Sequence, residues 1–134
     1  MGKSAEFRAR REICGLTQGD VADACGVRLL TVKRWEKLGE AEPPADAWEF
    51  LEGVEAARRA VVRQAVEAAA ADKPGAVRLT YCRTQEQYDA LGRGGGPVGV
   101  ANANARAVAD LLESMGIAVA WAYPDEEGFD AAIG

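Results

Sequence analysis

The chain has 134 residues, of which 49% are hydrophobic and 7% are aromatic. A chain of this length forms one domain or two very small ones, and this composition is typical of a globular, helix-rich protein and excludes a disordered one. No apolar run approaches the ~20 residues that a membrane-spanning helix needs, and the N-terminal residues lack the apolar core of a signal peptide. We therefore expect a cytoplasmic protein.

The net charge of −5 argues against a nucleic-acid partner until its distribution along the chain is considered. Residues 1–39 carry eight Lys or Arg and five Asp or Glu, a net +3, whereas residues 40–134 carry eight and sixteen, a net −8. The basic excess therefore lies in the N-terminal part, where contacts with phosphates would need it. The acidic remainder would repel DNA.

The three cysteines, Cys14, Cys25 and Cys82, are odd in number and widely spaced, and the chain has no histidine. Without a Cys-x-x-Cys pair, a zinc site would need at least one carboxylate ligand. We expect no metal and no cofactor, and small buried thiols in a reducing compartment. A regulatory thiol is the alternative.

Residues 4–14 (SAEFRARREIC) are predicted to form the first helix. Phe7 and Cys14 lie two turns apart and would pack inward, with Ile13 nearby. A basic face would remain outside, formed by Arg8, Arg10 and Arg11. This face either contacts DNA or is only solvated.

Residues 17–38 (TQGDVADACGVRLLTVKRWEKL) predict two short helices joined by a tight turn. Thr17 can cap the first helix, which would run from residue 18 to about residue 25, with Asp20 as its capping-box partner. Gly26 lies where a positive φ is wanted, which only glycine adopts without steric cost. The second helix would run from about residue 29 to residue 37.

The spacing of small and apolar residues in this stretch is that of a helix-turn-helix. Ala22 allows the two helices to cross closely, Gly26 allows a sharp turn, and Val32 anchors the second helix. The remaining inward positions are apolar as well: Val21, Cys25, Val27 and Trp35. A DNA-binding motif is the interpretation we favour, and a generic pair of helices with an apolar seam is the alternative.

The outward positions of this stretch are the candidate DNA-binding residues: Gln18, Arg28, Leu29, Leu30, Lys33 and Arg34. Gln18 can reach a phosphate at the start of its helix. Lys33 and Arg34 can reach guanine edges or phosphates. Leu29 and Leu30 either touch thymine methyl groups or pack on another protein.

The rest of the chain is predicted to combine helices with two strands. A connector at residues 40–44 precedes helical segments at 45–53 and 54–71, which Gly53 either kinks or separates. After a break at Lys73-Pro74-Gly75, the pattern predicts a strand at 77–82, a capped helix at 84–91, a loop at 92–97, a helix at 98–115 and a strand at 117–123. The residues from 125 onward form an acidic end that we expect to be solvated.

Two further expectations concern packing in this second half. The apolar side of the helix at 98–115 would be formed by Val100, Val108, Leu111, Leu112 and Met115. The strand at 117–123 is apolar on both faces, which predicts that it is largely buried.

Two short strands do not form a stable sheet alone, so their pairing matters. The helical segment between them allows either a parallel crossover within one chain or pairing between two subunits. A helix-turn-helix protein usually reads two half-sites as a two-fold dimer. We therefore expect the second half to dimerise, with strand pairing in the interface.

The stretches GLTQGDVADACGV (15–27) and TVKRWE (31–36) resemble the Cro/C1-type, lambda-repressor-like helix-turn-helix family. The order of the later segments is similar to that of YdiL-like proteins and anti-CRISPR-associated autoregulators. These segments are EPPADAWEFLEGV (42–54), VRLTY (77–81), EQYDAL (86–91) and the helix and strand at 104–123. The resemblance implies a homodimeric transcriptional regulator whose second motif helix enters the major groove. In this family Ser or Thr often stands where the chain has Arg28, and polar base readers are common where it has Leu29 and Leu30.

The fold class expected is mainly α with a small α/β part: a helix-turn-helix DNA-binding domain at 1–53, a helical connector at 54–73 and a small α/β dimerisation segment at 74–134. The expected function is sequence-specific binding of double-stranded DNA by a dimeric, self-regulating repressor. An antitoxin-like module whose main partner is a protein is the second possibility. We do not expect an enzyme, because the sequence offers no histidine, no nucleophile with a base and no paired carboxylates in a defined frame.

Overall fold

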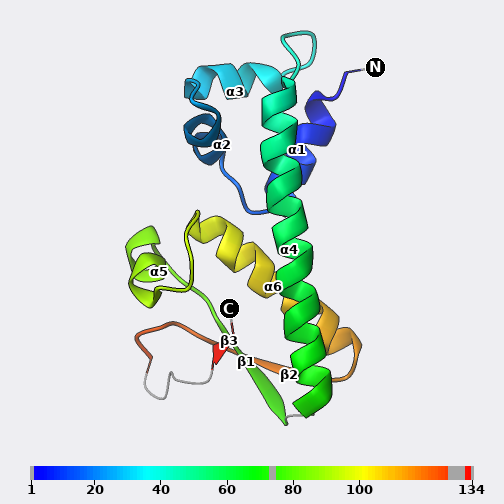
Figure 1. Cartoon of the computed structure of the whole chain (residues 1–134), viewed down its shortest axis with the longest axis vertical. Coiled ribbons are helices and arrows are strands. Elements are labelled where there is room, and N and C mark those ends of the chain that lie inside the picture. The colour runs from blue at the N-terminus through cyan, green and yellow to red at the C-terminus, as the bar shows by residue number, and fades with distance from the viewer. Residues whose placement is uncertain (1, 73–74, 127–131, 134) are drawn as a thin grey trace. The chain divides into compact units, whose positions relative to one another are not determined.

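The computed structural model describes residues 2–72, 75–126 and 132–133 (Figure 1). Its elements, in chain order, are α1 (Ser4–Ile13), α2 (Gln18–Cys25), α3 (Leu29–Trp35), α4 (Ala45–Asp72), β1 (Ala76–Thr80), α5 (Gln85–Leu91), α6 (Val98–Ser114), β2 (Ala118–Ala122) and β3 (Ala132–Ile133). The prediction of a mainly helical chain with a small α/β part is confirmed. The chain divides into two compact units, Met1–Ala57 and Arg58–Gly134, and α4 belongs partly to each.

The helix bounds in the first unit follow from local chemistry. Thr17 caps α2 by accepting a hydrogen bond from the Asp20 backbone N–H at 2.9 Å, and the Asp20 carboxylate accepts one from the Thr17 backbone N–H at 2.8 Å. The predicted capping box is thus confirmed. Gly26 ends α2 with a φ of 66°, which is the left-handed conformation that the turn into α3 requires.

The core of the first unit draws on all four of its helical segments. Phe7 of α1 lies at its centre, fully buried, with its ring edge-to-face against Trp35 at 6.3 Å and against Trp48 at 5.1 Å. The other buried apolar side chains of this unit include Cys14, Leu16, Val21, Ala22, Val32, Ala47 and Leu51. Aromatic pairs in this geometry add stability beyond the burial of their surface.

The second unit is a small parallel sheet packed against two helices. The strand order is β2-β1-β3, and β1 pairs in parallel with both neighbours, Val77 opposite Val119 and Leu79 opposite Ile133. The connection from β1 to β2 runs through α5 and α6, so the parallel crossover within one chain is the arrangement found. The core consists of Ala65 and Ala69 from α4, Val77 and Leu79 from β1, and Val108, Ala109 and Leu112 from α6.

Several details differ from the sequence-based expectations. Of the two alternatives left open at Gly53, the structure has one continuous helix, because Gly53 adopts helical geometry within α4. The helix predicted to reach residue 37 ends at Trp35, and a third strand of two residues, β3, was not predicted. The break predicted at Lys73-Pro74 and most of the acidic end lie outside the described residues.

The expected burial of β2 is wrong. β2 is at the edge of the sheet in the described part of the chain, and its Trp121 is 45% exposed. Leu111 of α6 and Met115, the residue that follows α6, are likewise 46% and 49% exposed, although both were predicted to lie on the apolar side of the helix. The buried face of α6 combines Val108 and Leu112, which were predicted, with the small side chains of Ala103, Ala105 and Ala109.

Candidate nucleic-acid interface

The helix α3 is held to the first unit by one side. Val32 is fully buried and Trp35 is 5% exposed, and both face the core against α1 and α2. The turn before α3 is fixed by a hydrogen bond of 3.0 Å from the Val27 backbone N–H to the Ala22 carbonyl. Since Ala22 is buried and small, α2 and α3 pack closely at this point. One face of α3 is thereby left to solvent.

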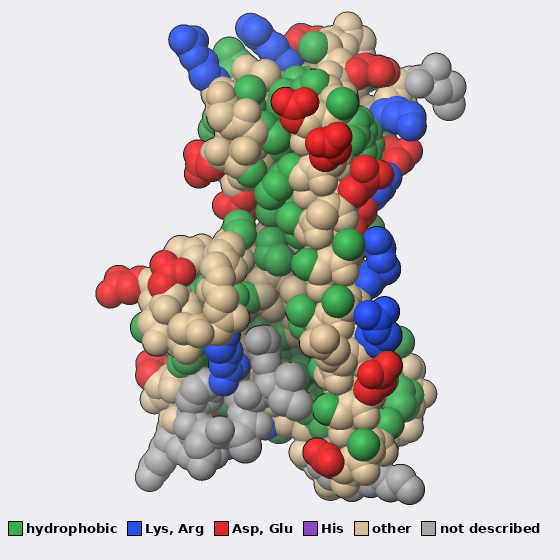
Figure 2. Space-filling view, in the orientation of Figure 1, with side chains coloured by type: hydrophobic (Ala, Val, Ile, Leu, Met, Phe, Trp, Pro, Cys, Tyr) green, Lys and Arg blue, Asp and Glu red, His purple; other side chains and the backbone are tan. Residues whose placement is uncertain are grey.

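The solvent face of α3 combines cations with two apolar side chains. Lys33 and Arg34 are exposed, and Leu29 and Leu30 are 45% and 55% exposed. Arg28, the residue just before the helix, is exposed and makes no side-chain cap. Residues 28–35 contain three basic side chains and no acidic one. In Figure 2, Lys and Arg side chains project where α3 lies, and acidic side chains gather over the first part of α4.

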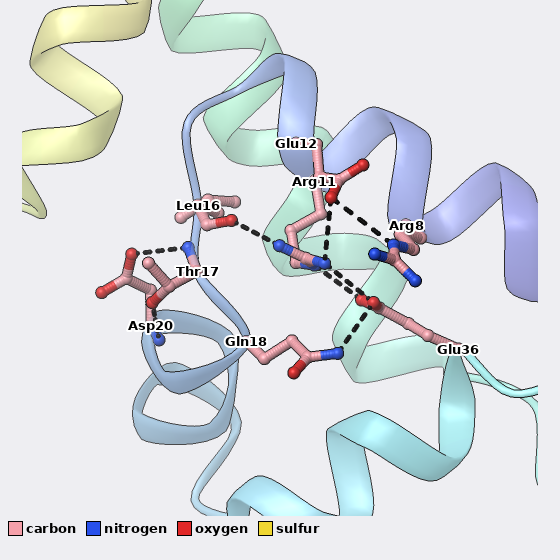
Figure 3. Close-up of polar contacts among 8 residues, drawn as sticks. All are labelled: Arg8, Arg11, Glu12, Leu16, Thr17, Gln18, Asp20 and Glu36. Carbon is pink, nitrogen blue, oxygen red and sulfur yellow. Dashed lines mark hydrogen bonds and ion pairs between the residues drawn. The ribbon is translucent and has the colours of Figure 1, made fainter.

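A buried ion pair positions the end of α3 (Figure 3). The Arg11 guanidinium of α1 donates to both carboxylate oxygens of Glu36, from Nε at 2.6 Å and from Nη2 at 2.8 Å. The two side chains are only 7% and 2% exposed. Arg11 Nη1 also donates to the Leu16 carbonyl at 2.8 Å, two residues before α2 begins. This cluster therefore joins α1, the chain leading into α2, and the end of α3.

Gln18 belongs to the same cluster. Its Nε2 donates to Glu36 Oε1 at 3.1 Å, so the predicted phosphate-contacting amide is engaged within the protein (Figure 3). An amide nitrogen carries two hydrogens, and one of them stays available for a phosphate oxygen. Through this hydrogen bond, Gln18 at the start of α2 is connected to Glu36 at the end of α3.

The prediction that α1 has an exposed basic face is wrong for Arg10 and Arg11, two of its three arginines. Arg11 is 6% exposed and is used inside the unit, while Arg10 binds Glu55 of α4 through two hydrogen bonds of 2.8 and 2.6 Å and binds Glu6 at 2.7 Å. These carboxylates, Glu55 first, raise the pKa of Arg10 further above its ordinary value. Only Arg8 remains exposed, 3.4 Å from Glu12.

Sequence reasoning missed the ion pair between Arg11 and Glu36 that positions α3, and it missed Lys37 as an exposed cation after α3. The Arg11–Glu36 pair spans 25 residues and has no local pattern that could reveal it. Lys37 follows α3 with a side chain that is 72% exposed, and it adds a cation beside Arg34. Glu40 lies 3.7 Å from Lys37 and 3.9 Å from Arg34, at exposed positions where such pairs contribute little.

The thiols are placed as expected for small apolar side chains. Cys14 and Cys82 are buried and Cys25 is partly buried. Burial raises the pKa of the Cys25 thiol, and the negative charge of Asp46 adds to the effect. Burial likewise raises the pKa of Cys82. A thiol with a raised pKa is a poor nucleophile and a poor metal ligand at neutral pH.

The described helices include none that is both long enough and apolar enough to cross a membrane. The chain matches no protein-family model and no curated protein.

Proposed function

We propose that this protein is a sequence-specific DNA-binding regulator that inserts α3 into the major groove. The observation that supports this most is the solvent face of α3, which presents Lys33 and Arg34, with the exposed Arg28 just before the helix and no acidic side chain among residues 28–35. A helix anchored by Val32 and Trp35 has the rigid support that a reading helix requires. The resemblance to Cro/C1-type helix-turn-helix proteins implies the same role.

Regulators of this kind act as two-fold dimers, and we propose that the second unit dimerises. The edge position of β2 supports this, because its outer side has no strand partner among the described residues and its sequence, AVAWA, has neither charge nor proline. Proteins usually protect such an edge, and pairing with a second copy is one way to do so. A monomer in sedimentation at micromolar concentration would contradict this part of the proposal. We place the regulator in the cytoplasm, with its DNA.

The direct test is binding to the DNA upstream of its own gene, compared with a scrambled fragment. We expect fluorescence anisotropy to show tight binding to the upstream fragment only, and affinity that falls steeply as salt concentration rises. The test variant is Lys33→Ala with Arg34→Ala. Each contact to a base edge that is lost should cost about 1–3 kcal/mol of binding free energy.

A matched control separates specific contacts from loss of charge. Arg59→Ala with Arg63→Ala removes two exposed cations from α4 in the second unit. We expect this control to bind DNA as the unchanged protein does, and both double variants to unfold at the same urea concentration. Equal weakening by the two pairs would mean that α3 does not carry the binding.

The second candidate is an antitoxin-like protein whose α3 face binds another protein. The half-exposed Leu29 and Leu30 favour it, because two adjacent exposed leucines are costly unless a partner or DNA covers them. Leu29→Ser with Leu30→Ser distinguishes the two functions. If the protein is a DNA-binding regulator, this double variant has a lower affinity for the upstream fragment. If α3 binds another protein, the double variant no longer co-purifies with that partner, and its affinity for DNA is unchanged.

A further inference from the structure

An open pocket of about 400 Å³ lies in the second unit, at the ends of the strands β1 and β2. Its described lining consists of Tyr81, Arg106, Trp121, Ala122, Tyr123 and Glu126. Tyr81 follows the last residue of β1, and Tyr123 follows the last residue of β2. In open sheets with parallel strands, ligands bind in the crevice outside the carboxyl ends of the strands. The volume lies in the range of pockets that hold small molecules.

Two aromatic side chains that line this pocket, Tyr81 and Trp121, lie nearly perpendicular to each other. The rings of Tyr81 and Trp121 lie edge-to-face, with centroids 5.6 Å apart and planes at 88°. Trp121 is 45% exposed and Tyr123 is 38% exposed, so part of each ring stays accessible. A flat ring can stack on one wall of such a corner while its edge meets the face of the other.

The pocket also holds a cation that no carboxylate of the described chain neutralises. Arg106 of α6 is exposed and donates from Nη1 to the Tyr81 hydroxyl at 2.6 Å, and among the described residues it forms no ion pair. The neighbouring Arg83 differs, because it stacks on Tyr123 at 4.6 Å and is bound to Asp125 at 2.6 Å.

The acidic residue of the lining is already engaged. Glu126 Oε1 accepts a hydrogen bond from the Tyr123 backbone N–H at 3.1 Å. The lining thus carries one cation and one anion, and Arg106 is the group in it that can pair with a ligand carboxylate, whereas the Glu126 carboxylate is bound to the backbone of the Tyr123 turn.

We propose that this pocket binds a small planar aromatic carboxylate, which stacks on Trp121 and pairs its carboxylate with Arg106. The Tyr81 hydroxyl accepts a hydrogen bond from Arg106 Nη1 at 2.6 Å, so the guanidinium is oriented before the ligand arrives. The inference does not depend on the proposed DNA binding, and its test contains no DNA.

The test uses the full chain labelled with 5-fluorotryptophan and titrated with 1-naphthoate. The chain has three tryptophans, so ¹⁹F NMR gives a separate signal for Trp121, with Trp35 and Trp48 of the first unit as internal references. We expect a saturable shift of the Trp121 signal alone. Cyclohexanecarboxylate, which has the charge without the flat ring, should cause a much smaller shift.

The charge requirement is tested with Arg106→Gln, and Arg63→Gln on α4 serves as the matched control because Arg63 is outside the lining. We expect Arg106→Gln to weaken binding of 1-naphthoate by at least about tenfold, since hydrogen bonds to charged groups are worth that much. Binding of the neutral 1-naphthamide should be the same in both variants, which shows that the aromatic walls are intact.

Three results would overturn the proposal. The first is a Trp121 signal that does not move at millimolar 1-naphthoate. The second is equal affinity for the carboxylate and the amide in the unchanged protein. The third is a Trp121 signal that shifts with protein concentration and no longer responds to 1-naphthoate, which would mean that a second copy of the chain covers the aromatic walls.

Discussion

Replacing Glu36 by Ala should remove the charge that neutralises Arg11 inside the first unit. The pair is 7% and 2% exposed, and its two hydrogen bonds are 2.6 and 2.8 Å long. In the variant, Arg11 keeps the Leu16 carbonyl at 2.8 Å but has lost its buried carboxylate. Removal of one partner of a buried ion pair costs about 3–5 kcal/mol, which is a large part of the total stability of a small domain.

The assay is urea unfolding followed by tryptophan fluorescence. In a Trp121→Phe background, only Trp35 and Trp48 report, and both belong to the first unit. Glu12→Ala is the matched control, because Glu12 lies 3.9 Å from the same Arg11 but is 54% exposed. We expect this control to lower the free energy of unfolding by no more than about 1 kcal/mol.

Equal losses for Glu36→Ala and Glu12→Ala would refute this reasoning, since burial would then make no difference. A second variant checks the cause of the loss. Arg11→Met combined with Glu36→Leu replaces both charges by apolar side chains, and such replacements are often neutral or stabilising. The double variant should therefore regain most of the stability that Glu36→Ala loses. If it is as unstable as Glu36→Ala, an unneutralised buried charge is not the reason.

The remaining predictions concern the same unit. Trp35→Ala should lower the free energy of unfolding by about 3–5 kcal/mol, measured by urea unfolding, because a buried ring is lost; a loss under about 1 kcal/mol would mean that Trp35 does not anchor α3. Gly26→Ala should cost about 1–2 kcal/mol, because φ is 66° and no neighbour lies within 4 Å, so only backbone strain acts. Gly53→Ala, inside α4, should instead raise stability by about 0.5–1 kcal/mol in the same assay. Cys25 should react with iodoacetamide more slowly in the native than in the urea-unfolded protein at pH 8, and its native rate should continue to rise above the ordinary thiol pKa of about 8.5, because burial raises its pKa; equal rates by mass spectrometry would contradict this.

The local features of the first unit were predictable because the residues that cause them are neighbours in the chain. Thr17 and Asp20 are three residues apart, and Gly26 acts through its own φ, so the capping box and the turn follow from sequence alone. The exposure of Leu29, Leu30, Lys33 and Arg34 also followed, because the inward positions of a short helix determine the outward ones. Contact of these side chains with DNA stays a prediction.

Other features depend on which elements meet, and the sequence alone could not decide them. In the sequence, Arg10 and Arg11 look like surface residues. In the structure, Arg11 pairs with Glu36, which is 25 residues away, and Arg10 pairs with Glu55 of α4, which is 45 residues away. The apolar strand β2 looked buried, but strand order placed it at an edge and left Trp121 half exposed.

What the sequence by itself determined is thus the helices, the two longer strands β1 and β2, the turn between α2 and α3, and the solvent face of α3. These depend on φ preferences, capping and periodicity, which act over a few residues. Only the tertiary structure decided which charges are buried and which apolar side chains are left uncovered, including the aromatic pocket around Trp121. Burial and ion pairing act between residues that are close in space, and proximity in space is set by the packing of distant segments.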